Sequence, residues 1–451
     1  GSQIIYIYQK SMMSKKINGF SKLSKIEKIK WIAETHFKNP EKARKELERH
    51  WNLDTKVQKT YDEFIENSLT NFYLPFGVAP NFLINEKYYT LPMVIEESSV
   101  VAAASNAAKF WCQRGGFETK VVNTIKVGQV HLMYKGNPER LKSFFDNRKN
   151  DFLNSTKSIT KNMEARGGGI ISIELIDKSD ILPYYFQLDL RFKTAESMGA
   201  NFINSCLESI AKDVMIHAEN DNLINDKKQD LEIVMSILSN YVPECLVNVM
   251  VKCNLKEFIL EENGLNGYNF AQKIVNALNI AKVEPYRAVT NNKGIMNGID
   301  ALIIATGNDF RAIEAGVHAY ASRSGQYQSL SKAYIENDQF IMELTLPLAV
   351  GTVGGLTNLH PMVNWSLELL GNPNVEELMS IIASAGLAQN FAALKSLVTT
   401  GIQKGHMKMH LLNILNQFKA DKAQKIAATN YFKNKIVSVS AVKKFLDENV
   451  F

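Results

Sequence analysis

The sequence predicts an α+β protein built from a large mixed helical and sheet domain, an inserted ferredoxin-like domain and a C-terminal helical flap. Three observations support this prediction: helical patterns on both sides of residues 120–238, a β-α-β-β-α-β order of segments within them, and a glycine-hinged tail from Thr399. A chain of 451 residues is also too long for one ordinary core. We therefore predict an N-terminal extension over 1–17, a large domain over 18–119 and 239–398, an inserted domain over 120–238, and a flap domain over 399–451.

The bulk composition is that of an ordinary soluble protein, with 45% hydrophobic and 22% charged residues. No apolar run approaches the roughly 20 residues that span a bilayer, so we expect a cytoplasmic protein without a membrane anchor. The apolar N-terminal stretch is short and no small-residue cleavage site follows it, which argues against a signal peptide. Gly1-Ser2 resembles a cloning remnant, and Met13 is a candidate natural start.

The net charge of +6 makes the chain mildly basic. Its lysines gather in surface-type stretches, such as 10–16 and 25–30, without the interleaved aromatic residues of a nucleic-acid-binding stripe. We therefore expect no nucleic-acid partner, and an anionic small substrate fits this charge equally well. The cysteines are scattered without a CxxC spacing, which favours buried free thiols over a zinc site; they are Cys112, Cys206, Cys245 and Cys253.

The N-terminal part of the chain is predicted to be mainly helical. Residues 18–50 have the pattern of two short helices, and Ser24 with Glu27 resembles a capping box. Helical spacing continues over residues 57–70. After a proline-broken stretch of turns and short strands, an alanine-rich helix is expected from Glu97 to a pair of glycines. Glu97 would then lie in the first turn, where negative charge suits the helix dipole.

The inserted region has the pattern of a four-stranded sheet with two crossover helices. Its glycine run, Gly167-Gly168-Gly169, allows the backbone to pass close to a ligand or another strand. The predicted strands are 126–134, 168–176, 184–192 and 232–238, and the predicted helices are 137–150 and 198–215. After the insertion we expect a strand over 245–251, a helix over 269–278, paired strands within 331–346 and two helices within 375–398.

Residues 286–325 concentrate polar and charged side chains around an apolar run. We predict a turn holding Lys293, a buried strand over Ala301–Ala305 and a helix over Phe310–Ala321, an arrangement at which α/β proteins often place their sites. The Lys293 ammonium could stabilise an oxyanion, or it could be an ordinary surface group. Asp309 could cap the helix or share protons with Lys293.

The sequence has neither the G-x-G-x-x-G nor the G-x-x-x-x-G-K-[ST] pattern, so an ordinary Rossmann domain or P-loop is not expected. His406 and His410 are four residues apart and would share one helix face. They could form a metal pair, lie on a solvated face, or belong to a flap that Gly401 and Gly405 hinge. No HExxH pattern or clear third ligand accompanies them, so we predict no metal site.

Several segments together resemble the hydroxymethylglutaryl-CoA reductases of the soluble bacterial class. These are EESSVVAAAS, ESMGAN, ILSN, YRAVTNNKGIMNGIDALIIATGNDFRAIEAG, LAVGTVGG and GIQKGHMKMH. They occur in the order found in that family, and the resemblance covers roughly residues 18–425.

The resemblance implies an NAD(P)H-dependent reduction of 3-hydroxy-3-methylglutaryl-CoA to mevalonate and CoA, in two hydride transfers through a hemithioacetal and an aldehyde. The family's catalytic positions fall on Glu97, Lys293, Asp309 and His406. Lys293 would stabilise the oxyanion, and Asp309 would hold and tune it. His406 on the flap would protonate the departing CoA thiolate, and Glu97 would supply the proton for aldehyde reduction.

The resemblance also implies the binding residues. Arg287 would pair with the substrate's free carboxylate; the other substrate positions are Ser99, Thr290, Asn297 and His410. The nicotinamide dinucleotide would sit on the ferredoxin-like domain, with its pyrophosphate at the start of a helix. The cofactor positions are Glu196, Met198, Gly199, Asn201, Asn240 and Lys161. The family's motif usually begins with aspartate where this chain has Glu196.

The stretch Ser158–Asn162 contains no acid, includes Lys161 and directly follows Lys157, and the two lysines would favour binding of a 2′-phosphate. We therefore predict a preference for NADPH, with NADH possible. The family forms its active sites between subunits, which implies a homodimer or a higher multiple of dimers. Three alternatives stay open: the same enzyme oxidising mevalonate, a CoA-ester-binding protein without redox turnover, and a zinc hydrolase that uses the two histidines.

Overall fold

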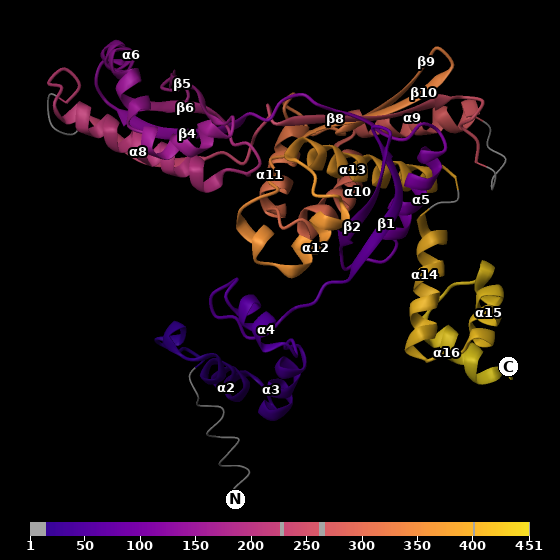
Figure 1. Cartoon of the computed structure of the whole chain (residues 1–451). Coiled ribbons are helices and arrows are strands. Elements are labelled where there is room, and N and C mark those ends of the chain that lie inside the picture. The colour runs from indigo at the N-terminus through magenta and orange to yellow at the C-terminus, as the bar shows by residue number, and fades with distance from the viewer. Residues whose placement is uncertain (1–14, 226–229, 261–266, 400–401, 451) are drawn as a thin grey trace, which may run out of the picture. The chain divides into compact units, whose positions relative to one another are not determined.

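The computed structural model describes residues 15–225, 230–260, 267–399 and 402–450 (Figure 1). Two compact units can be distinguished. The first contains the described residues up to Pro75 together with Asn358–Pro361, and the second contains Phe76–Thr357 together with the residues from Met362 onwards. This division is coarser than the four domains predicted above, so those boundaries stay a prediction.

The first unit is helical. It contains η1 (Phe20–Lys22), α2 (Lys25–His36), α3 (Pro40–Arg49) and α4 (Thr55–Asp62). The predicted capping box at α2 is confirmed, because Ser24 accepts the Glu27 N–H at 3.2 Å and Glu27 accepts the Ser24 N–H at 2.7 Å. The helical pattern predicted over residues 57–70 extends beyond the end of the observed helix. That helix, α4, ends at Asp62, whose carboxylate instead binds Lys25 at 2.7 Å.

The second unit contains an antiparallel sheet of four strands in the order β3-β8-β10-β9. These are β3 (Glu118–Val121), β8 (Leu246–Asn254), β10 (Gln339–Pro347) and β9 (Ser331–Glu336), so the pairing predicted within 331–346 is confirmed. A separate hairpin joins β1 (Phe76–Ile84) to β2 (Lys87–Val94).

Helices pack against these sheets around the largest hydrophobic cluster of the described chain. They are α5 (Val100–Cys112), α9 (Gly267–Val283), α10 (Pro285–Ala305), α11 (Phe310–Ala321) and α13 (Val375–Val398). Between β10 and α13 the chain also forms η2 (Gly355–Asn358) and α12 (Pro361–Leu369). Helix α13 is long and apolar enough to cross a membrane by length and composition alone. In the structure 67% of its most apolar window is buried, against α10, α5 and β8, so it is a core helix.

The two helices predicted within 375–398 are one continuous helix. Gly386 does not break α13, because the glycine lies where α10 approaches closely. A Cβ added to it would come within 2.9 Å of the Ile299 side chain. Gly298 on α10 has the reciprocal role, since its Cβ would lie 2.5 Å from the Ala385 carbonyl oxygen. Both glycines therefore permit close helix packing.

The strand predicted over Ala301–Ala305 is also wrong. These residues form the last turns of α10, which is 21 residues long, and Lys293 lies inside this helix rather than on a turn. The apolar run is buried because α10 packs against α13, β2 and α9. A helix covered on several sides is apolar around its whole circumference, so its sequence resembles that of a buried strand.

The inserted region has the predicted β-α-β-β-α-β order with one additional helix. Its elements are β4 (Lys126–Tyr134), α6 (Pro138–Asn154), α7 (Lys157–Ala165), β5 (Gly169–Asp177), β6 (Tyr185–Lys193), α8 (Ala200–Glu219) and β7 (Leu231–Leu238). The strand order β5-β6-β4-β7, antiparallel throughout, is that of a ferredoxin-like sheet. It encloses a hydrophobic cluster of its own.

The C-terminal part contains α14 (Ile402–Gln417), α15 (Lys422–Tyr431), η3 (Phe432–Asn434) and α16 (Val439–Glu448). These helices share a small core that includes Leu415, Phe432 and Val442. The prediction of a helical C-terminal segment is therefore confirmed, whereas its closing motion stays a prediction. All four cysteines are free thiols; three are buried, and Cys112 is only partly buried.

Candidate active site

One face of α10 lines a cleft of about 280 Å³. Arg287, Thr290 and Asn297, together with Lys293, lie three or four residues apart, so the helix presents them on the same side. The start of α5 and the C-terminal half of α13 form the other walls. The turn predicted for Lys293 was thus wrong, although the structure does gather the predicted side chains.

Glu97 and Lys293 come together across this cleft. The Lys293 Nζ lies 3.4 Å from Glu97 Oε2, and the two side chains are 61% and 42% exposed. Glu97 is not in the first turn of α5 as predicted, since the helix begins at Val100 after Ser99 with φ +78°. The left-handed residue turns the chain sharply, and Ser99, which also lines the cleft, makes no side-chain capping bond.

Arg287 has the properties of an anion-binding group. Among the described residues no carboxylate lies within ion-pair distance of its guanidinium, although the residue lines the cleft. Burial lowers the pKa of Arg287 from its ordinary value. A guanidinium nevertheless stays charged at neutral pH, so the cleft holds a partly desolvated cation that a carboxylate could pair with in bidentate geometry.

A buried amide network forms part of the cleft wall. Asn390 on α13 donates to Asn291 Oδ1 on α10 at 2.9 Å and accepts from Ser331 Oγ on β9 at 2.6 Å. Asn291 also donates to Ser329 Oγ at 2.9 Å. These bonds tie α10, α13 and the segment leading into β9 together beneath the substrate-facing residues. The sequence analysis missed the network; its signals are Asn291-Asn292 in α10 and Gln389-Asn390 in the largely apolar pattern of α13.

Asp309 does not line this cleft. It caps α11, accepting the backbone N–H groups of Arg311 and Ala312 at 3.0 and 3.1 Å, and it pairs with the Arg311 guanidinium at 3.2 Å. The capping role considered for it is confirmed. Its predicted pairing with Lys293 has no counterpart among the described contacts of this chain and stays a prediction.

The two histidines lie on α14. The side chain of His406 lies outside the described residues, and His410 is exposed. Within the ranges that the structure describes, no group of three or more His, Cys, Asp or Glu side chains has a geometry suited to a metal ion. The zinc alternative needs the His406 side chain, so it lies outside the described residues and stays a prediction.

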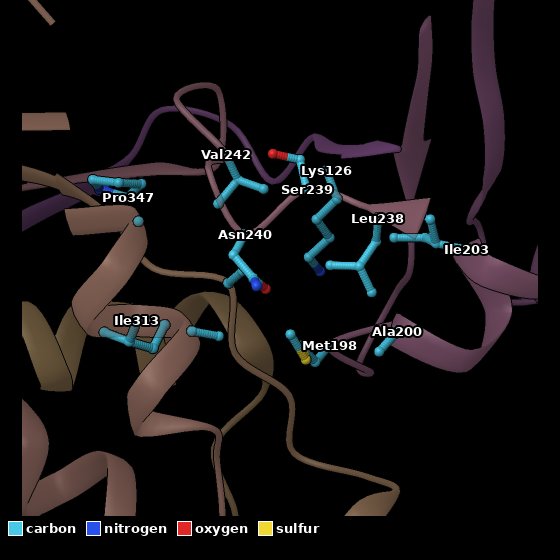
Figure 2. Close-up of a pocket in the computed structure, with 13 residues that line it drawn as sticks. Lys126, Met198, Ala200, Ile203, Leu238, Ser239, Asn240, Val242, Ile313 and Pro347 are labelled. Carbon is cyan, nitrogen blue, oxygen red and sulfur yellow. The ribbon is translucent and has the colours of Figure 1, made fainter. Parts of the chain in front are cut away.

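Part of the predicted cofactor motif surrounds a second, smaller cavity (Figure 2). Met198 from the loop before α8 and Asn240 from the segment between β7 and β8 point toward each other, and Lys126 from β4 points between them. Gly199 is the N-cap of α8 with φ +91°, and a Cβ there would clash with Thr194, so only glycine fits. No side chain caps α8, which leaves its first amide groups available to an anion.

Lys126 was not singled out by the sequence analysis. It is only 3% exposed, and its Nζ donates to Thr194 Oγ1 at 2.6 Å and to the Ser197 carbonyl at 3.2 Å. Burial lowers the pKa of Lys126 from its usual range. A lysine opening a strand pattern is an ordinary sequence feature, so nothing in the sequence marked its burial.

The remaining cofactor candidates are dispersed. Asn201 is exposed in the first turn of α8, and Lys161 is exposed on α7. Neither lines the cavity around Met198 and Asn240. Glu196 contacts α13, because its Oε2 accepts the N–H of Val375, the first residue of that helix, at 2.7 Å.

Behind α10 lies a chain of titratable groups. Asp300 adjoins Glu314 on α11, whose carboxylate lies 2.7 Å from His318, and His318 lies 2.8 Å from the Tyr327 hydroxyl. Burial, followed by the neighbouring Glu314, raises the pKa of Asp300 to about 9. The hydrogen bond with His318 is the main cause that lowers the pKa of Glu314. Asp300 therefore keeps its proton at neutral pH while Glu314 is ionised.

The chain combines a cleft that holds an ammonium, a guanidinium and a carboxyl group with a ferredoxin-like domain in which no side chain caps the N-terminus of α8, a combination that suits an oxidoreductase. Comparison with known proteins specifies the family. Residues 8–411 match the family model described as hydroxymethylglutaryl-coenzyme A reductase.

A curated relative, the 3-hydroxy-3-methylglutaryl-coenzyme A reductase of Archaeoglobus fulgidus, is 36% identical over 89% of this chain and 87% of its own length. A probable reductase of the same name from Borreliella burgdorferi is 35% identical over 79% of this chain and 80% of its own. A solved structure of the class II enzyme from Streptococcus pneumoniae, bound to NADPH in open conformations, matches with a TM-score of 0.69 and 38% identity. It covers 85% of this chain and 99% of that one.

The chain belongs to the hydroxymethylglutaryl-coenzyme A reductase family, a family of oxidoreductases, and its architecture matches the class II structures. The resemblance stated from the sequence motifs is confirmed.

Proposed function

We propose that the protein reduces 3-hydroxy-3-methylglutaryl-CoA to mevalonate and CoA, consuming two molecules of NADPH and two protons. The observation that carries this proposal is the Glu97–Lys293 pair at 3.4 Å in a cleft that also holds the Arg287 guanidinium, for which no described carboxylate lies within ion-pair distance. An ammonium, a carboxyl group and an anion anchor in one cleft are the groups that reduction of an anionic thioester requires.

Each residue has a separate task in this mechanism. Arg287 pairs with the free carboxylate and fixes the acyl chain along α10, with Ser99, Thr290 and Asn297 as neighbouring polar contacts. NADPH supplies the hydride that adds to the thioester carbonyl carbon. Lys293 stabilises the resulting oxyanion, which becomes the hemithioacetal.

Collapse of the hemithioacetal breaks the carbon–sulfur bond, gives the aldehyde and releases the CoA thiolate. His406 protonates this thiolate, and His410 on the same helix contacts the substrate. A second hydride then adds to the aldehyde, and Glu97 supplies the proton that the alkoxide takes up as mevalonate forms. Lys293 is held by Asp309 of a second subunit, because Asp309 of the same chain caps α11 and does not line the cleft.

The dinucleotide binds at the loop before α8, where the uncapped backbone N–H groups donate hydrogen bonds to its pyrophosphate. Lys157 and Lys161 on α7 favour a 2′-phosphate, and hence NADPH over NADH. The same helix carries exposed Glu164, an acid that the sequence analysis did not weigh. A preference for NADPH therefore requires that the two lysines lie nearer the adenosine ribose than Glu164 does. The active unit is at least a homodimer, and we expect a cytoplasmic location.

The decisive experiment follows reduced-nicotinamide absorbance with both cofactors and in both directions. We expect oxidation of NADPH on adding 3-hydroxy-3-methylglutaryl-CoA, with a higher kcat/KM than for NADH. Failure of both cofactors with this substrate would overturn the proposal. CoA-ester binding without turnover would support a binding protein, and chelator-sensitive thioester hydrolysis would support the hydrolase. A higher kcat/KM for mevalonate oxidation than for reduction would identify the oxidative enzyme.

A further inference from the structure

The loop Thr194–Gly199, which carries the cofactor motif, is bonded to the sheet and helices of the substrate cleft through Glu196. The carboxylate Oε2 accepts the Val375 N–H at 2.7 Å and the Thr352 hydroxyl at 3.1 Å. The Glu196 backbone carbonyl accepts the Thr352 N–H at 2.8 Å. One residue therefore makes three hydrogen bonds to segments that lie more than 150 positions later in the chain.

Other contacts hold the same loop in place. Ser197 forms an isolated β-bridge with Val353, and Gly351 approaches so closely that a Cβ would lie 2.6 Å from the Met198 nitrogen. From the opposite side, buried Lys126 donates to Thr194 and to the Ser197 carbonyl. The loop thus has little freedom to shift while Glu196 keeps its bonds.

The partner of Glu196 is the first residue of α13. Val375 is 4% exposed, and its N–H is one of the helix-terminal donors that no turn of the helix can satisfy. A carboxylate at this end also suits the helix dipole. Asn374 caps the Glu377 N–H, so Glu196 and Asn374 share the N-terminus of α13.

The other end of α13 lines the substrate cleft. Gln389, Asn390 and Ser396 are among the residues that form its wall, and Asn390 is hydrogen-bonded to Asn291 on α10. Helix α13 is one continuous, largely buried element of 24 residues. It therefore connects the cofactor loop at one end to the helix that carries Lys293 near the other.

We propose that Glu196 is a positioning residue that sets the cofactor loop in register with the substrate cleft through α13. The inference rests on the function proposed above and assigns Glu196 a task other than contact with the dinucleotide. Chemistry supports this assignment, because a carboxylate repels the phosphates that the α8 N-terminus attracts. Its second oxygen, Oε1, has no partner among the described residues, so direct cofactor contact is the competing outcome of the test.

The test compares Glu196→Ala, Glu196→Gln and Thr352→Val with Glu208→Gln, which changes an exposed glutamate on α8. For Glu196→Ala we expect kcat to fall roughly tenfold, because a small misplacement of the reacting atoms is costly, while the Kd for NADPH from fluorescence titration stays within about twofold. The deuterium isotope effect with 4-deuterated NADPH should rise as hydride transfer becomes slower. Thr352→Val should shift both quantities in the same direction by a smaller factor, and Glu208→Gln should leave them unchanged.

Glu196→Gln distinguishes positioning from charge. Its amide oxygen still accepts the Val375 N–H, so kcat should recover to within about threefold of the wild-type value. A tenfold weaker Kd for NADPH with an unchanged isotope effect in Glu196→Ala would overturn the inference and assign a cofactor contact. An unchanged kcat would overturn it as well. Absence of turnover in the unmodified protein would instead refute the proposed function, so the two failures are distinguishable.

Discussion

Replacing Lys293 by alanine should abolish turnover while leaving the fold intact. The structure explains this separation, because Lys293 lies on the cleft face of α10 with a side chain that is 61% exposed. Its described ion-pair partner is Glu97, which is itself 42% exposed. Removing an exposed side chain from a helix leaves no cavity, and alanine has the higher helix propensity.

The expected effects of Lys293→Ala on stability and on turnover differ widely in size. At 3.4 Å, Coulomb's law gives about 1 kcal/mol for the Glu97–Lys293 pair in water, and exposed pairs usually contribute about 0–1 kcal/mol to stability. In the reaction, loss of a single oxyanion donor costs about 100- to 1,000-fold in kcat. We therefore expect a loss of at least about 100-fold in turnover with a change in unfolding free energy below about 1 kcal/mol.

The assay is steady-state oxidation of NADPH by the full-length protein, accompanied by thermal unfolding and by hydrogen exchange of α10. Lys282→Ala on α9 is the matched control, since Lys282 is exposed and does not line the cleft. It should keep normal turnover. Retention of more than about one tenth of wild-type turnover by Lys293→Ala would refute the oxyanion role.

Three further predictions follow from individual contacts. Arg287→Lys should raise KM for the CoA ester about tenfold with a smaller change in kcat, because lysine keeps the charge but loses the bidentate geometry; an unchanged KM would exclude the carboxylate contact. Asn390→Leu should destabilise α10 by about 1–3 kcal/mol, because it leaves Asn291 Oδ1 buried without its donor; hydrogen exchange of α10 as slow as in the wild type would contradict this. Asp300→Asn should flatten the dependence of thermal stability on pH. The folded-state pKa of Asp300, about 9, lies above its ordinary value of 3.8, so its contribution is fully present below that ordinary value and is lost as pH rises through the folded pKa. The wild type should therefore lose stability relative to this variant as pH rises from 3.8 to about 9, and a parallel dependence of melting temperature on pH in the two proteins across that range would refute the assignment.

Local patterns were sufficient where a segment's own residues decide its conformation. The capping box of Ser24 and Glu27 was predictable because both partners lie within one helical turn. The ferredoxin-like order was predictable because its strands and helices are separated by turn-forming residues. Local patterns failed at α10, where burial on several sides removed the periodicity that distinguishes a helix from a strand. At α13 the helical pattern was recognised, but the continuity of the helix through Gly386 depends on its packing against α10.

The sequence by itself determined the family and the strand order of the ferredoxin-like domain, since these depend on motifs and turns that can be read in a single chain. Tertiary structure decided which of the site residues meet. It brought Glu97 to Lys293 from 196 positions away, kept Asp309 at a helix cap, and directed Glu196 to α13. Long-range packing places side chains by the contacts of whole elements, so no local spacing could show that buried Lys126 and Asn390 support the two ends of this arrangement.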